Sequence, residues 1–119
     1  MQIKVDAAQI QQVLINLVQN AADSIGRGGT ITLRARRSRQ QLGDGPAEVA
    51  ILEVSDTGKG IPPEVEKRLF DPFFTTKEKG TGLGLAIAAR MVEMNGGALQ
   101  YQTQLDHGST FGIVLPICS

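Results

Sequence analysis

The chain has 119 residues, which fits one domain, and a domain of this size buries about two-thirds of its unfolded surface. Its 12 basic and 12 acidic residues give a formal net charge of zero, which excludes a broad basic surface for nucleic acid or anionic lipid. One cysteine excludes a disulfide framework, and no apolar run approaches the ~20 residues that span a bilayer. We therefore expect a soluble, cytoplasmic domain that contacts neither nucleic acid nor membrane directly.

Residues 7–25 predict a long amphipathic helix after a short, weakly alternating strand at residues 2–5. Asp6 provides an N-cap, and a glycine-rich segment at 26–29 ends the helix. Apolar residues at spacings of three and four form the buried stripe: Ile10, Val13, Leu14, Leu17, Val18 and Ala21. On the flank of this stripe lie Asn16 and Asn20, four residues apart. Asparagine is a poor helix former, so these amides predict a polar function, although bonding to neighbouring loops is the simpler alternative.

The next segments predict a β-hairpin whose second strand ends at Asp56. Residues 30–36 alternate, with apolar side chains on one face and arginines on the wet face, and residues 48–55 return as a strand. We expect the intervening polar residues 40–47 to form the hairpin loop. The arginines lack interleaved aromatic residues, so they do not indicate nucleic-acid binding.

The second half of the chain predicts a short helical turn, a longer helix and another hairpin. Pro62 and Pro63 open the turn, which continues to Phe70. The helix at 85–95 is apolar on nearly all sides, so we expect it to be deeply buried. Strands at 98–104 and 109–116 then form an antiparallel pair. Because the strands come in hairpin pairs, the pattern predicts an α+β fold.

Two glycine clusters lie between these halves, at 58–60 and 80–84, on either side of a polar loop. Glycine is tolerated where the backbone needs a positive φ or approaches a ligand closely, so the clusters favour a phosphate-bearing ligand held by the main chain. Two ordinary turns are the alternative. The second cluster precedes a helix, whose N-terminal N–H groups and dipole attract phosphate.

Five short motifs give the chain a strong family resemblance that covers almost its whole length. In chain order they are NLVQNA (16–21), DTGKGIP (56–62), FDPFFTTK (70–77), GTGLGL (80–85) and GSTF (108–111). Their order and spacing resemble the N, first glycine, F and second glycine boxes and the last strand of the ATP-binding catalytic domain of sensor histidine kinases. This family lies in a superfamily with gyrase B, MutL and the ATP-dependent heat-shock chaperone.

The resemblance implies a two-layer α/β sandwich, with a mixed, mostly antiparallel sheet packed against helices, formed by residues 1–119. It implies that Asn20 binds Mg²⁺, that Asn16 supports the coordination shell of this ion, and that both residues are catalytic. Asp56 would accept a hydrogen bond from the adenine amine. The implied nucleotide-binding residues are Asn16, Asn20, Asp56, Gly58, Gly60, Ile61, Lys77, Lys79, Gly80, Thr81, Gly82, Leu83, Gly84, Leu85 and Ser109.

The implied reaction is transfer of the ATP γ-phosphoryl group to a histidine on a separate upstream dimerisation domain, which then supplies a response regulator receiver domain. The only histidine here, His107, lies in the last hairpin and is expected to be an exposed loop residue. We expect the chain alone to be monomeric, because dimerisation belongs to the acceptor domain.

Two other functions stay open. Asp23 replaces a basic residue common in these kinases, and the lid is short, so a nucleotide-binding regulatory or degenerate module without phosphotransfer is one alternative. An ATPase or serine-kinase relative is the other. Asn16 argues against fast hydrolysis, because the ATPase members carry a water-activating glutamate at that position.

Overall fold

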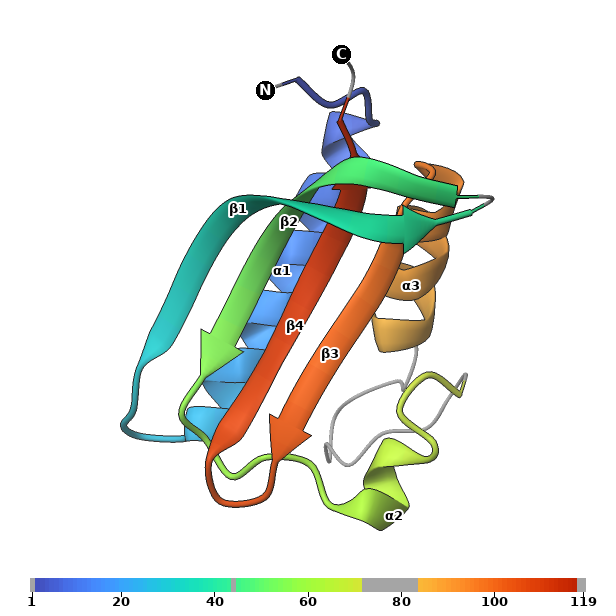
Figure 1. Ribbon diagram of the computed structural model, residues 1–119. Helices are drawn as coiled ribbons and strands as arrows, with labels where there is room; N and C mark the ends of the chain where they lie inside the picture. Colours follow the sequence, from blue (N-terminus) through green and yellow to red (C-terminus); the bar gives the residue numbers. More distant parts are fainter. Residues whose placement is uncertain (1, 44, 72–83, 118–119) are drawn as a thin grey trace.

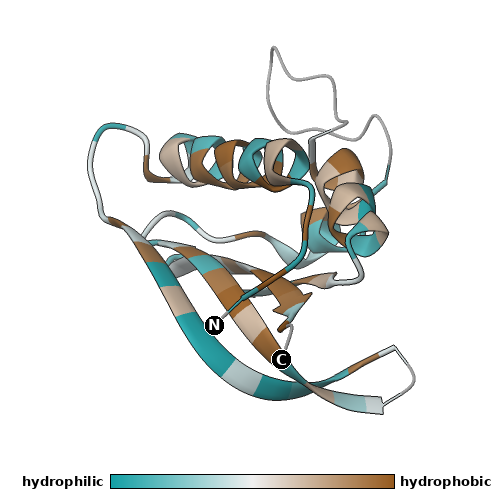
Figure 2. Cartoon of the chain, turned by 90° about the horizontal axis from the view of Figure 1, so that it is seen from above, coloured by the Kyte–Doolittle hydropathy of each residue, from teal (hydrophilic) through white to brown (hydrophobic). Residues whose placement is uncertain are grey.

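The structure is a computed structural model that describes residues 2–43, 45–71 and 84–117. It has two layers, a sheet and a helical layer that covers one face of it (Figures 1 and 2). The elements are α1 (Ala7–Ile25), β1 (Ile31–Leu42), β2 (Gly45–Asp56), α2 (Pro63–Glu66), α3 (Gly84–Met94), β3 (Ala98–Gln104) and β4 (Gly108–Pro116). None of the helices in these ranges is long and apolar enough to cross a bilayer.

The sheet has four strands in the order β1-β2-β4-β3, and each neighbouring pair is antiparallel. Figure 1 shows α1 behind the central strands and α3 behind the edge strand β3. This arrangement confirms the predicted α+β, two-layer fold. The predicted strand at residues 2–5 is wrong, because in that segment only Gln2 makes an isolated bridge.

Helix α1 has the predicted bounds and the predicted cap. The Asp6 carboxylate accepts from the Gln9 backbone N–H at 3.1 Å, and Gly26 ends the helix with φ +60°. Of the predicted stripe, Ile10, Val13, Leu17 and Ala21 are buried, and they join one core cluster with Val54, Ala88, Val92, Phe111, Ile113 and Leu115. Full burial of a side chain such as Leu17 stabilises the fold by roughly 1.5–3 kcal/mol.

The first hairpin is longer than predicted. Residues 40–47 were expected to form a loop, but β1 continues to Leu42 and β2 begins at Gly45, so that prediction is wrong. Gly43, with φ +64°, lets the chain reverse in a tight turn. The hairpin curves beyond the helical layer (Figure 2), and on this part of the sheet Val49, Ile51 and Val114 form a second, smaller cluster.

Two predictions of burial are also wrong. Helix α3 buries Ala88 and Val92, but Ile87 is 40% exposed and Met94 61% exposed, because the helix packs on β3 and α1 with one side only. In β1, Leu33 is 64% exposed. This strand is the edge of the sheet, and α1 packs mainly against its neighbour β2.

Asn95, directly after α3, joins the two helices. Its Oδ1 accepts from the Asp6 N–H at 2.8 Å, and its Nδ2 donates to Gln9 Oε1 at 2.9 Å and to Met91 O at 2.8 Å. One amide therefore ties the end of α3 to the start of α1. The turn behind it closes at Gly96, whose φ is +81°.

Tyr101 on β3 ties α2 to the sheet. Its ring centroid lies 5.7 Å from that of Phe70 and 5.6 Å from that of Phe111, and its hydroxyl donates to Glu66 Oε1 at 3.1 Å. Desolvation by burial, then the hydrogen bond to Glu66 and its charge, raise the pKa of Tyr101 above the ordinary value of 10.0, because each disfavours the phenolate.

We predict that Asn95→Ala lowers the free energy of unfolding by about 1–3 kcal/mol, because two hydrogen bonds to the start of α1 and one to Met91 within α3 are lost together. Urea unfolding followed by circular dichroism measures this. Gln11→Ala, at an exposed position of α1, is the control and should change the value by less than about 0.5 kcal/mol. Equal stability of the two variants would contradict the role of Asn95.

We predict that Tyr101 titrates above pH 10.0 in the folded chain. The raised pKa means that the neutral phenol stabilises the fold fully below pH 10.0 and that this contribution is lost as the pH rises through the folded-state pKa. Because the chain has one tyrosine and no tryptophan, ultraviolet absorbance reports Tyr101 alone. Glu66→Gln should move the midpoint down. An identical midpoint in the folded and the urea-unfolded chain would refute the prediction.

Candidate functional site

One flank of α1 carries a row of polar side chains at intervals of four residues: Gln12, Asn16, Asn20 and Ser24. At one end, Asn16 Nδ2 donates to the Gly84 carbonyl at 3.5 Å, and Gln12 Nε2 donates to Asn16 Oδ1 at 3.3 Å. At the other end, Ser24 bonds the carboxylate of Asp56. Eight residues of helix span about 12 Å, so the row joins the start of α3 to the end of β2. Asn20 lies between these ends and is half-buried.

Asp56, the last residue of β2, is half-buried, and its carboxylate is fixed by two donors. The Gly58 backbone N–H bonds Oδ1 at 2.9 Å, and the Ser24 hydroxyl bonds the same oxygen at 3.2 Å. Within the described ranges, no donor bonds Oδ2. The carboxylate therefore has an ordered orientation and one oxygen with free acceptor capacity.

The loop after Asp56 needs glycine at two positions. A Cβ at Gly58 would lie 2.1 Å from Ser24 Oγ and 2.6 Å from the Ser24 carbonyl oxygen. Gly60 has φ +72°, and a Cβ there would lie 2.4 Å from the Gln104 carbonyl oxygen. The loop is thus pressed between α1 and the β3–β4 turn.

Three hydroxyl and backbone groups connect this loop to the sheet. The Ile61 N–H donates to Thr103 Oγ1 at 2.9 Å, and Thr103 Oγ1 lies 2.8 Å from Ser109 Oγ. Ser109 is only 7% exposed and pairs with Asp56 in the β2–β4 register. Its hydroxyl is thus engaged by Thr103, while its backbone lies directly beside Asp56.

The structure therefore brings Asp56, Gly58, Gly60, Ile61 and Ser109 together at one end of the row. Gly84 begins α3 at the other end, and Leu85 is half-buried against the core. The predicted lid residues lie outside the described residues: Lys77, Lys79, Gly80, Thr81, Gly82 and Leu83.

Three residues of this arrangement were not predicted from the sequence: Gln12, Ser24 and Thr103. Ser24 follows Asn20 by four residues, a spacing that could have revealed it. Thr103 faces Ser109 across the β3–β4 pair, and no local pattern indicates that partner.

The donor set fits Mg²⁺ if phosphate shares the coordination. The described part of the chain holds no cluster of three or more His, Cys, Asp or Glu that could form a metal site. The amide oxygens on the α1 flank are hard donors, and Mg²⁺ commonly uses few protein ligands together with phosphate and water. His107 is exposed in the β3–β4 turn, as expected.

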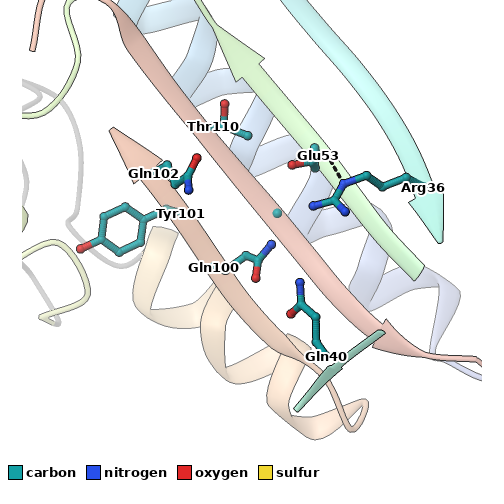
Figure 3. A pocket seen from close by; sticks show the side chains of 8 residues that line it. Arg36, Gln40, Glu53, Gln100, Tyr101, Gln102 and Thr110 are labelled. Atoms are coloured by element: carbon teal, nitrogen blue, oxygen red, sulfur yellow. Dashed lines mark hydrogen bonds and ion pairs between the residues drawn. The ribbon is translucent and has the colours of Figure 1, made fainter. Parts of the chain in front are cut away.

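A separate hollow of about 300 Å³ lies on the sheet (Figure 3). It is lined by Arg36, Gln40, Glu53, Gln100, Tyr101, Gln102, Thr110 and Gly112. Within it Arg36 pairs with Glu53 at 3.0 Å. Glu53 and Thr110 alternate with Val54 and Ser109, so their side chains lie on the face opposite to the helices and to Asp56.

Comparison with known proteins shows similarity along nearly the whole chain. The family described as histidine kinase-, DNA gyrase B- and HSP90-like ATPase matches residues 5–118. Sensor kinase CckA of Brucella abortus is 42% identical over 96% of this chain and 13% of its own length. Sensor histidine kinase ZraS of Salmonella typhi is 42% identical over 97% of this chain and 23% of its own. The chain thus spans less than a quarter of the length of these two relatives.

Solved structures agree with the sequence comparison. The catalytic domain of histidine kinase ThkA superposes with a TM-score of 0.77 at 35% identity, covering 96% of this chain and 70% of that one. Full-length ShkA, solved in complex with AMPPNP, gives a TM-score of 0.75 at 30% identity over 93% of this chain and 22% of that one. The chain therefore belongs to the family of histidine kinase-, DNA gyrase B- and HSP90-like ATPases, as an ATP-binding catalytic domain of the sensor histidine kinase type.

Proposed function

We propose that this domain binds Mg-ATP along the polar flank of α1, with the adenine at Asp56 and the phosphates toward Asn16, Asn20 and the start of α3. The proposal rests on the geometry of the Asp56 carboxylate. The Ser24 hydroxyl and the Gly58 N–H both donate to its Oδ1. An ordered acceptor beside a loop that only glycine can form suits a flat ring with an exocyclic amine.

At the base end, Oδ2 of Asp56 accepts the adenine amine. Gly58 and Gly60 keep the backbone close to the ring, and Ile61 adds apolar surface at its edge. Ser109 supports this end through its backbone pairing beside Asp56 and its bond to Thr103. A carboxylate that reads an amine gives selectivity for adenine over bases with a carbonyl at that position.

At the phosphate end, the helix dipole and free N–H groups at the start of α3 attract the charged groups. The proposed contacts are Lys77, Lys79, Gly80, Thr81, Gly82, Leu83, Gly84 and Leu85. Asn20, supported by Asn16, holds Mg²⁺ by its amide oxygen, and the bound ion supplies charge neutralisation at the phosphates. Asn16 is already oriented by Gln12 and Gly84.

We further propose that the γ-phosphoryl group passes to a histidine on a separate dimerisation domain, and from there to a receiver domain of a response regulator. The sensor kinase names of the relatives and the position of the only histidine, away from the phosphate end, support this assignment. His107 lies in the turn against the base end, since the Asp106 N–H beside it donates to the Lys59 carbonyl at 2.8 Å. The chain's part in transfer is then to position the nucleotide in the cytoplasm, where ATP is supplied.

The proposed function predicts nucleotide binding, which is measured by calorimetric titration with ATP and ADP, with and without Mg²⁺. We expect Asp56→Asn to weaken binding at least about 100-fold. Ser24 and Gly58 would draw the new amide oxygen toward themselves, which turns the amide NH₂ toward the adenine amine and sets two donors against each other. Asn20→Ala should remove the dependence on Mg²⁺ but retain binding of the base.

The control for Asp56→Asn is Glu53→Gln, an acidic residue of the same strand that faces the other side of the sheet. This variant should bind nucleotide as the wild type does. If the wild type binds no adenine nucleotide, the proposed function fails and the degenerate-module alternative replaces it.

A second prediction concerns the reaction. With radiolabelled ATP, the chain alone should gain no acid-labile phosphate and should release little inorganic phosphate, because Asn16 cannot act as a general base for water. Addition of a dimerisation domain with its histidine should produce labelled acceptor. Stable label on the chain alone, or rapid phosphate release, would disprove the assignment of the acceptor or favour the ATPase alternative, respectively.

A further inference from the structure

We infer that Ser24 is a positioning residue that sets the base selectivity of this domain by fixing the plane of the Asp56 carboxylate. The inference rests on the proposed function, since it concerns how the adenine end of that site is built. Ser24 is not part of the motifs that identify the family. It is assigned here because its hydroxyl lies 3.2 Å from Asp56 Oδ1.

A second donor is needed because a carboxylate rotates easily. The final torsion of an aspartate side chain has a broad energy profile, so one hydrogen bond leaves the plane of the carboxylate loosely defined. The Gly58 N–H, only two residues along the chain, supplies that one bond at 2.9 Å. Ser24 approaches from α1 and is 32 residues away in sequence. Two donors from different elements therefore fix both the position and the rotation of the carboxylate.

Gly58 has a second role in this geometry. A Cβ at this position would lie 2.1 Å from Ser24 Oγ, so any side chain would displace the hydroxyl that orients Asp56. The glycine thus leaves room for the serine and also supplies the first donor. The hydroxyl, the glycine and the carboxylate act as one unit.

The orientation determines which base is accepted. Both donors among the described residues bond Oδ1, so within this part of the chain Oδ2 can accept from the ligand. An amine at the purine 6-position satisfies this acceptor, whereas a carbonyl oxygen sets two acceptors against each other. If the carboxylate rotates, its hydrogen bond to the amine weakens, whereas the affinity for the ligand with a carbonyl changes little. Loss of Ser24 should therefore reduce discrimination between the two bases.

The test measures the dissociation constants of ADP and inosine diphosphate for the wild type and for Ser24→Ala, at the same Mg²⁺ concentration. The two ligands carry the same phosphates and differ in the amine. We expect Ser24→Ala to weaken ADP binding by about tenfold and to leave inosine diphosphate binding nearly unchanged, so that the ratio falls by about tenfold. Ser24→Thr, which keeps the hydroxyl, should retain most of the wild-type ratio.

The matched control is Ser55→Ala. Ser55 is also a half-buried serine, and its hydroxyl bonds that of Thr110 on the opposite face of the sheet, one residue from Asp56. This variant should keep the wild-type ratio. If Ser24→Ala does not fold, Ser24→Cys replaces the hydroxyl with a weak donor of similar size and should lower the ratio in the same direction.

An unchanged ratio in a folded Ser24→Ala variant would overturn the inference. Equal weakening of both ligands would also overturn it, because a purely structural role lowers binding without regard to the amine. Wild-type protein that binds neither ligand would refute the proposed function itself and the inference with it. Wild-type protein that prefers ADP while Ser24→Ala keeps that preference would refute the inference alone.

Discussion

The arrangement of the site depends on how α1 is rotated against the sheet. Val13 and Leu17 are almost fully buried, so the helix cannot turn about its axis without exposing them. The same rotation sets the polar flank, on which Asn16 lies beside Gly84 and Ser24 lies beside Asp56. A helix rotated by one residue, about 100°, would separate both ends of the row from their partners. The hydrophobic core therefore determines where the polar row of α1 lies.

Backbone packing is the second constraint. The loop after β2 fits between α1 and the β3–β4 turn because Gly58 and Gly60 lack side chains that would collide there. The loop is then fastened by backbone donors, from Gly58 to Asp56 and from Ile61 to Thr103. Hence the glycines of this motif are explained by contacts within the protein, before any ligand is considered.

Periodicity in the sequence predicted the α+β fold class and one side of the candidate site, but not the length of the first hairpin. It gave α1 its observed bounds and placed Asn16 and Asn20 on one flank, because helical spacing is a local property. It failed for Leu33, because exposure of an edge strand depends on where the distant helix lies. It also missed Ser24 and Thr103, whose roles appear only when α1, β2 and β3 are brought together.

Among the described residues, the two ends of the polar row differ in how many contacts hold their side chains in place. The Asp56 end has its donors, glycine contacts and hydroxyl pair in place, so an adenine would meet an ordered acceptor. The other end offers Asn16, already bonded, and the start of α3, which would attract any phosphate group alike. Under the proposed binding mode, selectivity among nucleoside triphosphates would come from the Asp56 end, since these ligands carry the same phosphates and differ in the base. In the proposed reaction this division would help, because a base held in place at Asp56 also positions the phosphates at the other end of the row.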